Sequence, residues 1–256
     1  MGPRNLKAVV WNVYHGTPAA TLAPAMVEQI KRGVRLFLMA EAGGHDLSEL
    51  CRSLGLLSVA HGGQRIAWVP ADALNADLVH RPGFPGLQLL WSEPLRLSDT
   101  GWHHVGDSPG SPLSYSDAVG ALFSDCYGRT LHAVSYHLPP HVQHPAAPPA
   151  RVKAAEESWA RLSQLSISTR ATGVLFGGDD NYDETRPGGP GPFRYGRGLT
   201  QIRAPRPTHA GGRRIDDFVT RSSGPGKMRR IGAGWVVNVA APDDHNLFGQ
   251  QFAWPA

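Results

Sequence analysis

Side chains that can bind a cation or move a proton stand at the ends of several short strands predicted from the sequence. They carry carboxylate, amide and imidazole groups, and the chain supplies them at six places: Asn12, Glu41, His137, Asp179 to Asn181, Asp216 with Asp217, and Asp243 to His245. Loops at strand ends are where sheets usually place their chemistry. Carboxylate and amide oxygens suit a hard cation such as Mg²⁺ or Mn²⁺. Imidazoles beside carboxylates suit proton transfer.

Short apolar segments and a few amphipathic ones must position these groups. Strands are expected at residues 6–13, 34–39, 64–69, 87–97, 118–123, 129–137, 173–177, 215–220, 234–239 and 247–253. Helices are expected at residues 21–33, 46–54 and 151–168. The Gly- and Pro-rich stretch 185–207 is expected to be a long surface loop. No internal repeat or linker is evident, so residues 1–256 are predicted to form one mixed α/β domain.

The composition argues against some classes of protein but does not identify a function. The chain has 256 residues, of which 41% are apolar and 18% charged, with a formal net charge of +4. This permits an anionic substrate without requiring one. No apolar run reaches the roughly 18 residues that a membrane helix needs, and no signal core is evident. We therefore expect a cytoplasmic protein without a membrane partner, in which Cys51 and Cys126 stay reduced.

The positive charge is concentrated in one segment. Residues 203–230 hold eight basic and two acidic residues, a net charge of +6 that exceeds that of the whole chain. Such a run is usually a solvated face. Because it brackets Asp216, a surface that contacts a phosphate backbone is an equal alternative. Phe193 and Tyr195, in the adjoining stretch, are candidates for stacking on unpaired bases.

The polar groups belong to six motifs: Trp11-Asn12, Ala40-Glu41, Tyr136-His137-Leu138, Gly177-Gly178-Asp179-Asp180-Asn181, Arg214-Ile215-Asp216 and Asp244-His245. In this order they resemble the motifs of the endonuclease/exonuclease/phosphatase superfamily, the DNase I-like and exonuclease III-like phosphodiesterases. The resemblance covers residues 7 to about 252. It implies an α/β/β/α four-layer sandwich, in which two packed mixed β-sheets are flanked by helices. The site then lies at one end, between the sheets.

The resemblance also implies a metal site. Glu41 takes the place of the main metal carboxylate, assisted by Asn12 and Asp244, and the cation is Mg²⁺ or Mn²⁺. Four positions depart from the family pattern: Tyr14, Ala40, Asp180 and Asp243. The extra carboxylates of Asp180 and Asp243 either attract a second cation or face solvent. On their own residue types, Asp180, Asp217 and Asp243 are expected to be structural.

The remaining residues of the motifs take catalytic roles by the same resemblance. Asp179 and Asn181 align the attacking water and the phosphate. Asp216 orients His245 and stabilises its charge, as in hydrolase triads. His137 contacts the phosphate or assists the leaving oxygen. Either Asp179 or the Asp216–His245 pair removes the proton of the water.

Substrate contacts and function follow from these assignments. Arg213 and Arg214 precede Asp216 and are predicted, with His137 and Asn181, to bind substrate. The leading hypothesis is a divalent-metal-dependent nuclease that hydrolyses DNA or RNA with an activated water. A phosphatase or phosphodiesterase for small-molecule or lipid phosphates is the second hypothesis, because function depends on the loops of a fold. An inactive binding or structural protein on the same fold is the third.

Overall fold

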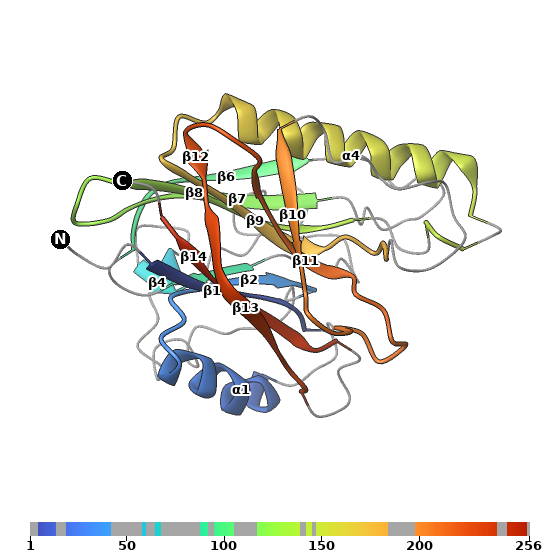
Figure 1. The fold of residues 1–256 in the computed structure, drawn as a ribbon, viewed down its shortest axis with the longest axis horizontal. Helices are drawn as coiled ribbons and strands as arrows, with labels where there is room; N and C mark the ends of the chain where they lie inside the picture. Colours follow the sequence, from blue (N-terminus) through green and yellow to red (C-terminus); the bar gives the residue numbers. More distant parts are fainter. Residues whose placement is uncertain are drawn as a thin grey trace.

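Two packed β-sheets form the centre of the molecule. The structure is a computed structural model, and it describes residues 5–13, 19–41, 58–59, 65–67, 88–91, 95–104, 117–138, 142–144, 147–183, 198–239 and 245–254. Figure 1 shows the sheets between two helices, α1 (Ala19–Lys31) on one side and α4 (Pro149–Ser168) on the other. The four-layer sandwich expected from the sequence is therefore confirmed. No helix in these described ranges has the length and apolarity needed to span a membrane.

The first sheet carries the opening strand of the chain. Its order is β13 (Arg229–Val237), β14 (Leu247–Ala253), β1 (Asn5–Asn12), β2 (Leu36–Ala40) and β5 (Gln88–Trp91). Strands β1 and β2 are parallel, and the other pairs are antiparallel. The register pairs Asn12 with Ala40. Asn12 and Glu41, the residue after Ala40, therefore lie at the same end of the sheet.

The second sheet carries the other site motifs. Its order is β10 (Leu199–Arg203), β11 (Asp216–Arg221), β9 (Gly173–Asp179), β8 (Thr130–His137), β7 (Asp117–Ser124) and β6 (Arg96–His104). The short β12 (Gly226–Lys227) pairs with the start of β9. Strands β8 and β9 are parallel, so this sheet is also mixed. A separate pair joins β3 (Ser58–Val59) to β4 (Arg65–Ala67).

Apolar side chains fill three interfaces between these layers. Leu38 and Phe218 belong to the cluster between the sheets, where they are fully buried. Trp11 belongs to the cluster under α1. On the α4 side, Trp159 packs edge-on against Tyr136 with ring centroids 5.4 Å apart. The prediction that Trp11 and Trp159 belong to the core is confirmed. Side chains alternate between the two faces of a strand, and the central strands β2 and β9 are buried at every position, so they bury both faces.

The structure corrects two of the predicted elements. Residues 199–203 lie in β10, although the stretch 185–207 was predicted to be a loop. Gly and Pro are dense only in the first part of that stretch, and Leu199–Arg203 pairs with β11 along its whole length. The predicted strand 87–97 is in fact two strands in different sheets, β5 and the start of β6, with Pro94 between them in the sequence. The predicted helix at residues 46–54 lies outside the described residues.

Candidate active site

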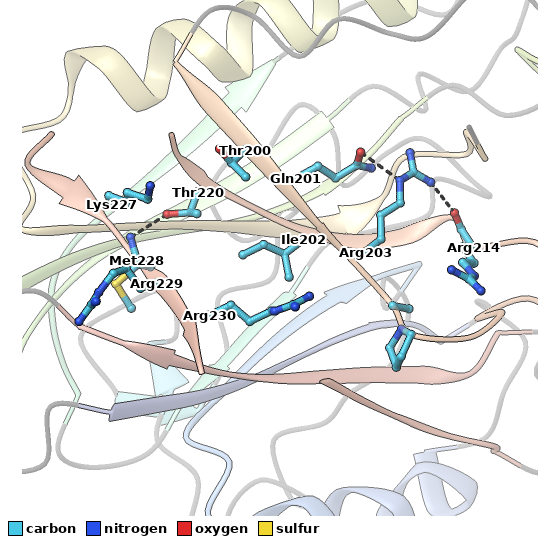
Figure 2. Close-up of a pocket in the computed structure, with 12 residues that line it drawn as sticks. Thr200, Gln201, Ile202, Arg203, Arg214, Thr220, Lys227, Met228, Arg229 and Arg230 are labelled. Carbon is cyan, nitrogen blue, oxygen red and sulfur yellow. Dashed lines mark hydrogen bonds between the residues drawn. The ribbon is translucent and has the colours of Figure 1, made fainter. Parts of the chain in front are cut away.

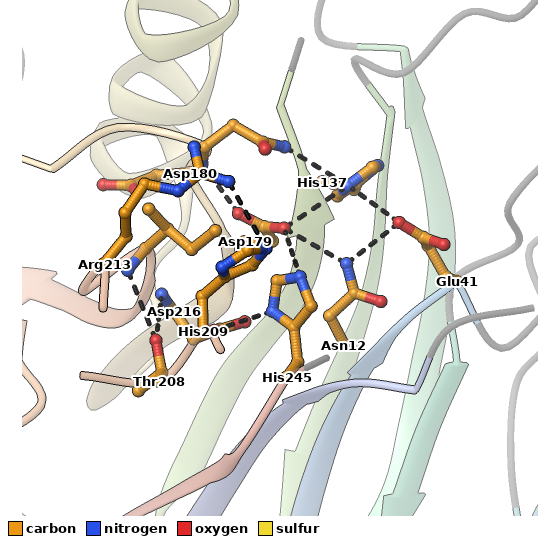
Figure 3. Close-up of polar contacts among 12 residues, drawn as sticks. Asn12, Glu41, His137, Asp179, Asp180, Thr208, His209, Arg213, Asp216 and His245 are labelled. Atoms are coloured by element: carbon orange, nitrogen blue, oxygen red, sulfur yellow. Dashed lines mark hydrogen bonds and ion pairs between the residues drawn. The ribbon is translucent and has the colours of Figure 1, made fainter. Parts of the chain in front are cut away.

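The first sheet delivers an amide and a carboxylate to the site. Asn12 is the last residue of β1 and is almost fully buried. Its side-chain nitrogen donates to Oε1 of Glu41 at 3.0 Å and to Oδ2 of Asp179 at 3.1 Å. Asn12 therefore connects carboxylates that come from opposite sheets (Figure 3).

Asp179 is the central residue of the second sheet at this end. The parallel register of β8 and β9 places it beside His137, and the antiparallel register of β9 and β11 places it beside Asp216. The two glycines before Asp179 let β9 pack closely against the facing sheet and against β8. A Cβ on Gly178 would lie 1.8 Å from the carbonyl oxygen of Tyr136, and a Cβ on Gly177 would clash with side chains of the facing sheet.

Two imidazoles stabilise the charged form of Asp179. Its Oδ2 lies 3.6 Å from Nε2 of His137 and 3.7 Å from Nε2 of His245. Burial alone would raise the pKa of this carboxyl. The hydrogen bond with His137, the charges of both histidines and the backbone N–H of Asn181 outweigh it and lower the pKa to about 2. Asp179 is therefore ionised at neutral pH.

His137 lies between two carboxylates. Its Nε2 is 3.5 Å from Oε1 of Glu41 and 3.6 Å from Asp179. Burial acts to lower the pKa of this imidazole, but the hydrogen bond and the charge of Asp179, followed by the charge of Glu41, raise it above its ordinary value. A protonated imidazole at this position could donate to a phosphate oxygen.

Asp216 and His245 form a hydrogen-bonded pair. Nδ1 of His245 lies 3.0 Å from Oδ2 of Asp216. Burial raises the pKa of Asp216, while the charge and hydrogen bond of His245 oppose the rise. The hydroxyl oxygen of Thr208 accepts the backbone N–H of Asp216 at 3.2 Å, which fixes the start of β11. The arrangement holds the imidazole with Nε2 toward Asp179, as an acid–base pair requires.

His209 is a member of the site that sequence reasoning missed. Its ring packs edge-on against that of His245, with centroids 5.0 Å apart and planes at 87°. The backbones of the two residues also pair in an isolated bridge. The N–H of Gly211 donates to Nδ1 of His209 at 2.8 Å, and Arg213 lies 3.4 Å from Nε2. The only sequence signal is a histidine shortly before the Arg-Ile-Asp motif.

Backbone strain coincides with the predicted site. Among residues with described backbones, the non-glycine residues with positive φ are Glu41 at 53° and Asn181 at 52°. Such conformations cost free energy and gather at functional sites. The side-chain nitrogen of Asn181 donates to the carbonyl oxygen of Leu138 at 2.9 Å and lies 3.3 Å from Nε2 of His137. Both residues were assigned to the site from sequence.

The structure brings together most of the predicted site residues: Asn12, Glu41, His137, Asp179, Asn181, Asp216 and His245. Asp244 lies outside the described residues, as do Tyr14, Phe193, Tyr195 and Asp243. The two arginines predicted to bind substrate lie in different places. Arg213 approaches His209 (Figure 3), whereas Arg214 lines a separate groove.

Two sets of donor atoms in the described residues fit a cation. One donor atom each from Asp179, Asp216 and His245 lie within 4.8 Å of one another. The second set is Glu41 and Asp179, whose oxygens are both contacted by the Asn12 amide. Since Asp216 and His245 already bind each other, the carboxylate and amide set offers a hard cation the better fit.

A second pair of aspartates lies on the opposite face of the same strands. Asp180 and Asp217 are almost fully buried, so the alternative in which Asp180 faces solvent is wrong. The side-chain nitrogen of Gln201 donates to Oδ2 of Asp180 at 3.0 Å and also to Asp217. Burial, and then the neighbouring charge of Asp217, raises the pKa of Asp180 well above its ordinary value. Burial raises that of Asp217 to about 7, although Arg203 opposes the rise.

Comparisons with known proteins show the fold. No protein-family model and no curated protein matches the sequence. Among solved structures, the chain is similar to an endonuclease/exonuclease/phosphatase from Beutenbergia cavernae, with a TM-score of 0.65 and 14% identity over 99% of this chain and 72% of that one. It is similar to the human nocturnin catalytic domain with bound sulfate, with a TM-score of 0.64 and 11% identity over 99% and 96%. It is also similar to ANGEL2, described as a 2′,3′-cyclic phosphatase, with a TM-score of 0.58 and 9% identity over 97% and 95%.

These likenesses define the class of fold. The chain has the DNase I-like fold of the endonuclease/exonuclease/phosphatase proteins, and the predicted resemblance and fold class are confirmed at this level. Identities this low carry no information on substrate, so function has to be argued from the residues of the site.

Proposed function

We propose that the protein is a divalent-metal-dependent phosphodiesterase of the endonuclease/exonuclease/phosphatase superfamily, and specifically a nuclease that hydrolyses DNA or RNA. One observation carries the proposal. Asp179, buried and ionised, is in contact with the amide of Asn12 and lies within 3.7 Å of His137 and His245, while His245 is bound in turn by Asp216. A fold alone does not require this convergence of residues from five separate motifs.

The acid–base chemistry follows from these contacts. With Nδ1 directed at Asp216, His245 presents Nε2 toward Asp179, where it can remove a proton from an attacking water. Asp179, with a pKa of about 2, is a weak base at neutral pH. We therefore assign the base to the Asp216–His245 pair. Asp179 and Asn181 align the water and the phosphate, and the protonated His137 donates to a phosphate or leaving oxygen.

A divalent cation fits the proposed chemistry. Glu41 and Asp179, with Asn12 and with Asp244 as a further predicted ligand, would hold Mg²⁺ or Mn²⁺. When bound, the cation would offset the negative charge of the phosphate and lower the pKa of a bound water. The carboxylates alone would repel an anionic substrate, which is the physical reason for expecting the metal.

The choice of nucleic acid over a small phosphoester rests on charge. The strongly basic segment 203–230 contains the start of β11 and therefore leads directly to Asp216. Arg213 and Arg214 are proposed as substrate contacts. The second candidate, a phosphatase for small or lipid phosphates, is favoured by the likeness to a protein described as a cyclic phosphatase. We keep the cytoplasmic location and the single-domain organisation as predictions.

A substrate panel with and without metal tests the proposal. Purified protein with Mg²⁺ or Mn²⁺ is expected to nick plasmid DNA or degrade single-stranded DNA or RNA, and a chelator is expected to abolish this. If Asp179→Ala or His245→Ala retains full activity, the site assignment is wrong. Turnover of soluble phosphoesters without cleavage of any nucleic acid would favour the second candidate. Absence of turnover across the whole panel would favour an inactive protein.

A further inference from the structure

A cationic groove lies at the open edge of the two sheets. Strands β13 and β10 are edge strands of the first and second sheets, and the groove between them has a volume of about 590 Å³ (Figure 2). Its lining contains five basic side chains and no acidic one: Arg203, Arg214, Lys227, Arg229 and Arg230. A cavity of this composition attracts anions.

The groove cations differ from other basic side chains of residues 203–230, which bind backbone carbonyl groups. Arg221 donates to the carbonyl oxygens of Ser166 and Thr169 at the C-terminal end of α4, and Arg206 donates to that of Val236. Their guanidinium groups therefore have structural partners. The +6 charge of residues 203–230 consequently divides into cations that hold the backbone together and cations that face the groove.

Four of the groove cations keep their charge available to a ligand. Arg203 is the exception, because its positive charge acts on the buried carboxylates of Asp217 and Asp180. Within the described ranges, no hydrogen bond or ion pair engages the side chains of the other four: Arg214, Lys227, Arg229 and Arg230. Lys227, Arg229 and Arg230 are also exposed.

The groove starts beside the proposed active site and runs away from it. Arg214 is two residues before Asp216. Thr220, four residues after Asp216 in β11, accepts the N–H of Met228 at 2.9 Å. This bond places Lys227, the residue before Met228, close to Thr220. At about 3.3 Å per strand residue, the groove extends about 13 Å beyond the level of Asp216. This length spans more than one phosphate of a nucleic-acid strand.

We infer that this groove binds the sugar-phosphate backbone of a nucleic-acid strand on one side of the bond that is cleaved. The inference rests on the proposed nuclease function and deepens it, since it assigns a binding site to Arg214, Lys227, Arg229 and Arg230. A small phosphoester would occupy the catalytic cluster without reaching Lys227. The groove therefore discriminates in favour of a polymer.

Charged edge strands have another use, which the test must separate. Lysine and arginine at a sheet edge prevent pairing with a second molecule. Edge protection needs charge of either sign and makes no contact with nucleic acid. Under that alternative, removing the cations would promote aggregation and leave the affinity for nucleic acid unchanged.

The test compares two triple variants that lose the same charge. The first is Lys227→Gln/Arg229→Gln/Arg230→Gln. The control is Lys31→Gln/Arg96→Gln/Lys153→Gln, whose three side chains are exposed and lie outside the groove. Anisotropy of a fluorescent 12-nucleotide single strand is measured in chelator, so that no cleavage occurs, over a range of salt concentrations.

The groove variant is expected to bind at least about tenfold more weakly than the control. Its slope of log affinity against log salt is expected to be smaller by about 2, which is the loss of three phosphate contacts on a single strand. With metal present, its ratio of polymer to bis-(p-nitrophenyl) phosphate hydrolysis is expected to fall by a similar factor. Equal affinities and slopes in the two variants would overturn the inference, whether or not the groove variant aggregates.

The proposed function has a separate readout. If the wild-type protein cleaves nucleic acid with metal while the two variants bind alike, the groove assignment fails and the nuclease function stands. If the wild-type protein hydrolyses only the small diester and does not bind the 12-nucleotide strand, the nuclease function fails, and the groove assignment fails with it.

Discussion

Two pairs of aspartates stand in nearly the same register on opposite faces of one sheet. Asp179 and Asp216 are direct partners across β9 and β11 and face the first sheet, where amide and imidazole groups surround them. Asp180 and Asp217 are the next residues along the chain and face outward, bound by Gln201. The inner pair sits among proton donors that stabilise an ionised Asp179, whereas burial raises the pKa of both carboxyls of the outer pair.

Residue type and burial do not distinguish the proposed catalytic aspartates from the other pair. All four aspartates are almost fully buried. What differs is the face of the strand, and therefore the partners, because successive side chains of a strand point to opposite sides. The inner pair contacts groups from both sheets, whereas the outer pair is bound by Gln201 of the neighbouring strand.

Metal removal should have the largest effect, and it should act on the inner pair only. Chelation is expected to abolish hydrolysis, by more than about 10³-fold, because the phosphate would otherwise meet uncompensated carboxylates. Mn²⁺ is expected to raise the unfolding temperature of the wild-type protein and of Asp217→Asn, since a ligand that binds the folded state stabilises it. Glu41→Gln is expected to lose most of this rise. An equal rise in Glu41→Gln, measured by calorimetry, would place the metal elsewhere.

The second-largest effect should come from replacing the β11 aspartate of each pair in turn. Asp216→Asn is expected to lower kcat by about 10² to 10⁴-fold, because the amide cannot orient and stabilise His245 as the carboxylate does. Asp217→Asn, the neighbouring change, is expected to stay within about threefold. Steady-state kinetics over a range of pH supply the measurement. Similar losses in both variants would contradict the division between faces.

The outer pair should instead control how stability depends on pH. The pKa of Asp217 rises from 3.8 to about 7 on folding, so in this window the folded protein holds a proton that the unfolded chain has released. The contribution of this group to the free energy of unfolding is therefore present below pH 3.8 and is lost as pH rises through 7. Asp217→Asn removes the titration. Its stability relative to wild type is expected to increase between pH 5 and pH 8, by up to about 2 kcal/mol.

Urea unfolding at the two pH values checks this, and Glu156→Gln, an exposed position on α4, serves as the control. If the stability of Asp217→Asn relative to wild type is the same at both pH values, folding does not raise the pKa of Asp217.

His209 should give the smallest effect. Its ring supports that of His245 through an edge contact, with ring centroids 5.0 Å apart. His209→Ala is expected to lower kcat by about two- to tenfold and to shift the pH profile, because His245 would gain rotational freedom. His209→Phe, which keeps a ring, is expected to recover part of the loss. If His209→Phe is no better than His209→Ala, the edge contact does not position His245.

Much of the fold could be predicted from short-range patterns. The apolar runs that became β1, β8, β9, β11 and β14 are typical of strands buried on both faces, and the six motifs stood in the order of a known family. Strand β10 was missed because its evidence is not local. Leu199–Arg203 is a strand because it pairs with β11 at the edge of the sheet, and the Gly- and Pro-rich residues before it obscured that.

The site was predictable where a motif marks it and unpredictable where only tertiary contact does. Seven motif residues converge, whereas His209 reaches His245 only because the turn between β10 and β11 brings their backbones together. The sequence also holds two aspartate doublets, Asp179-Asp180 and Asp216-Asp217, and only the resemblance to a family assigned the first member of each to the site. The register of β9 and β11 pairs these two first members directly.

The most direct test of the account uses two adjacent residues that carry the same side chain. Asp179→Asn and Asp180→Asn make the same chemical change one residue apart, on opposite faces of β9. Cleavage of a single-stranded oligonucleotide with Mn²⁺ is measured for both after their folding has been checked by circular dichroism. The account predicts a loss of at least about 10³-fold for Asp179→Asn and a change within about threefold for Asp180→Asn. Equal activities, or a larger loss for Asp180→Asn, would contradict it.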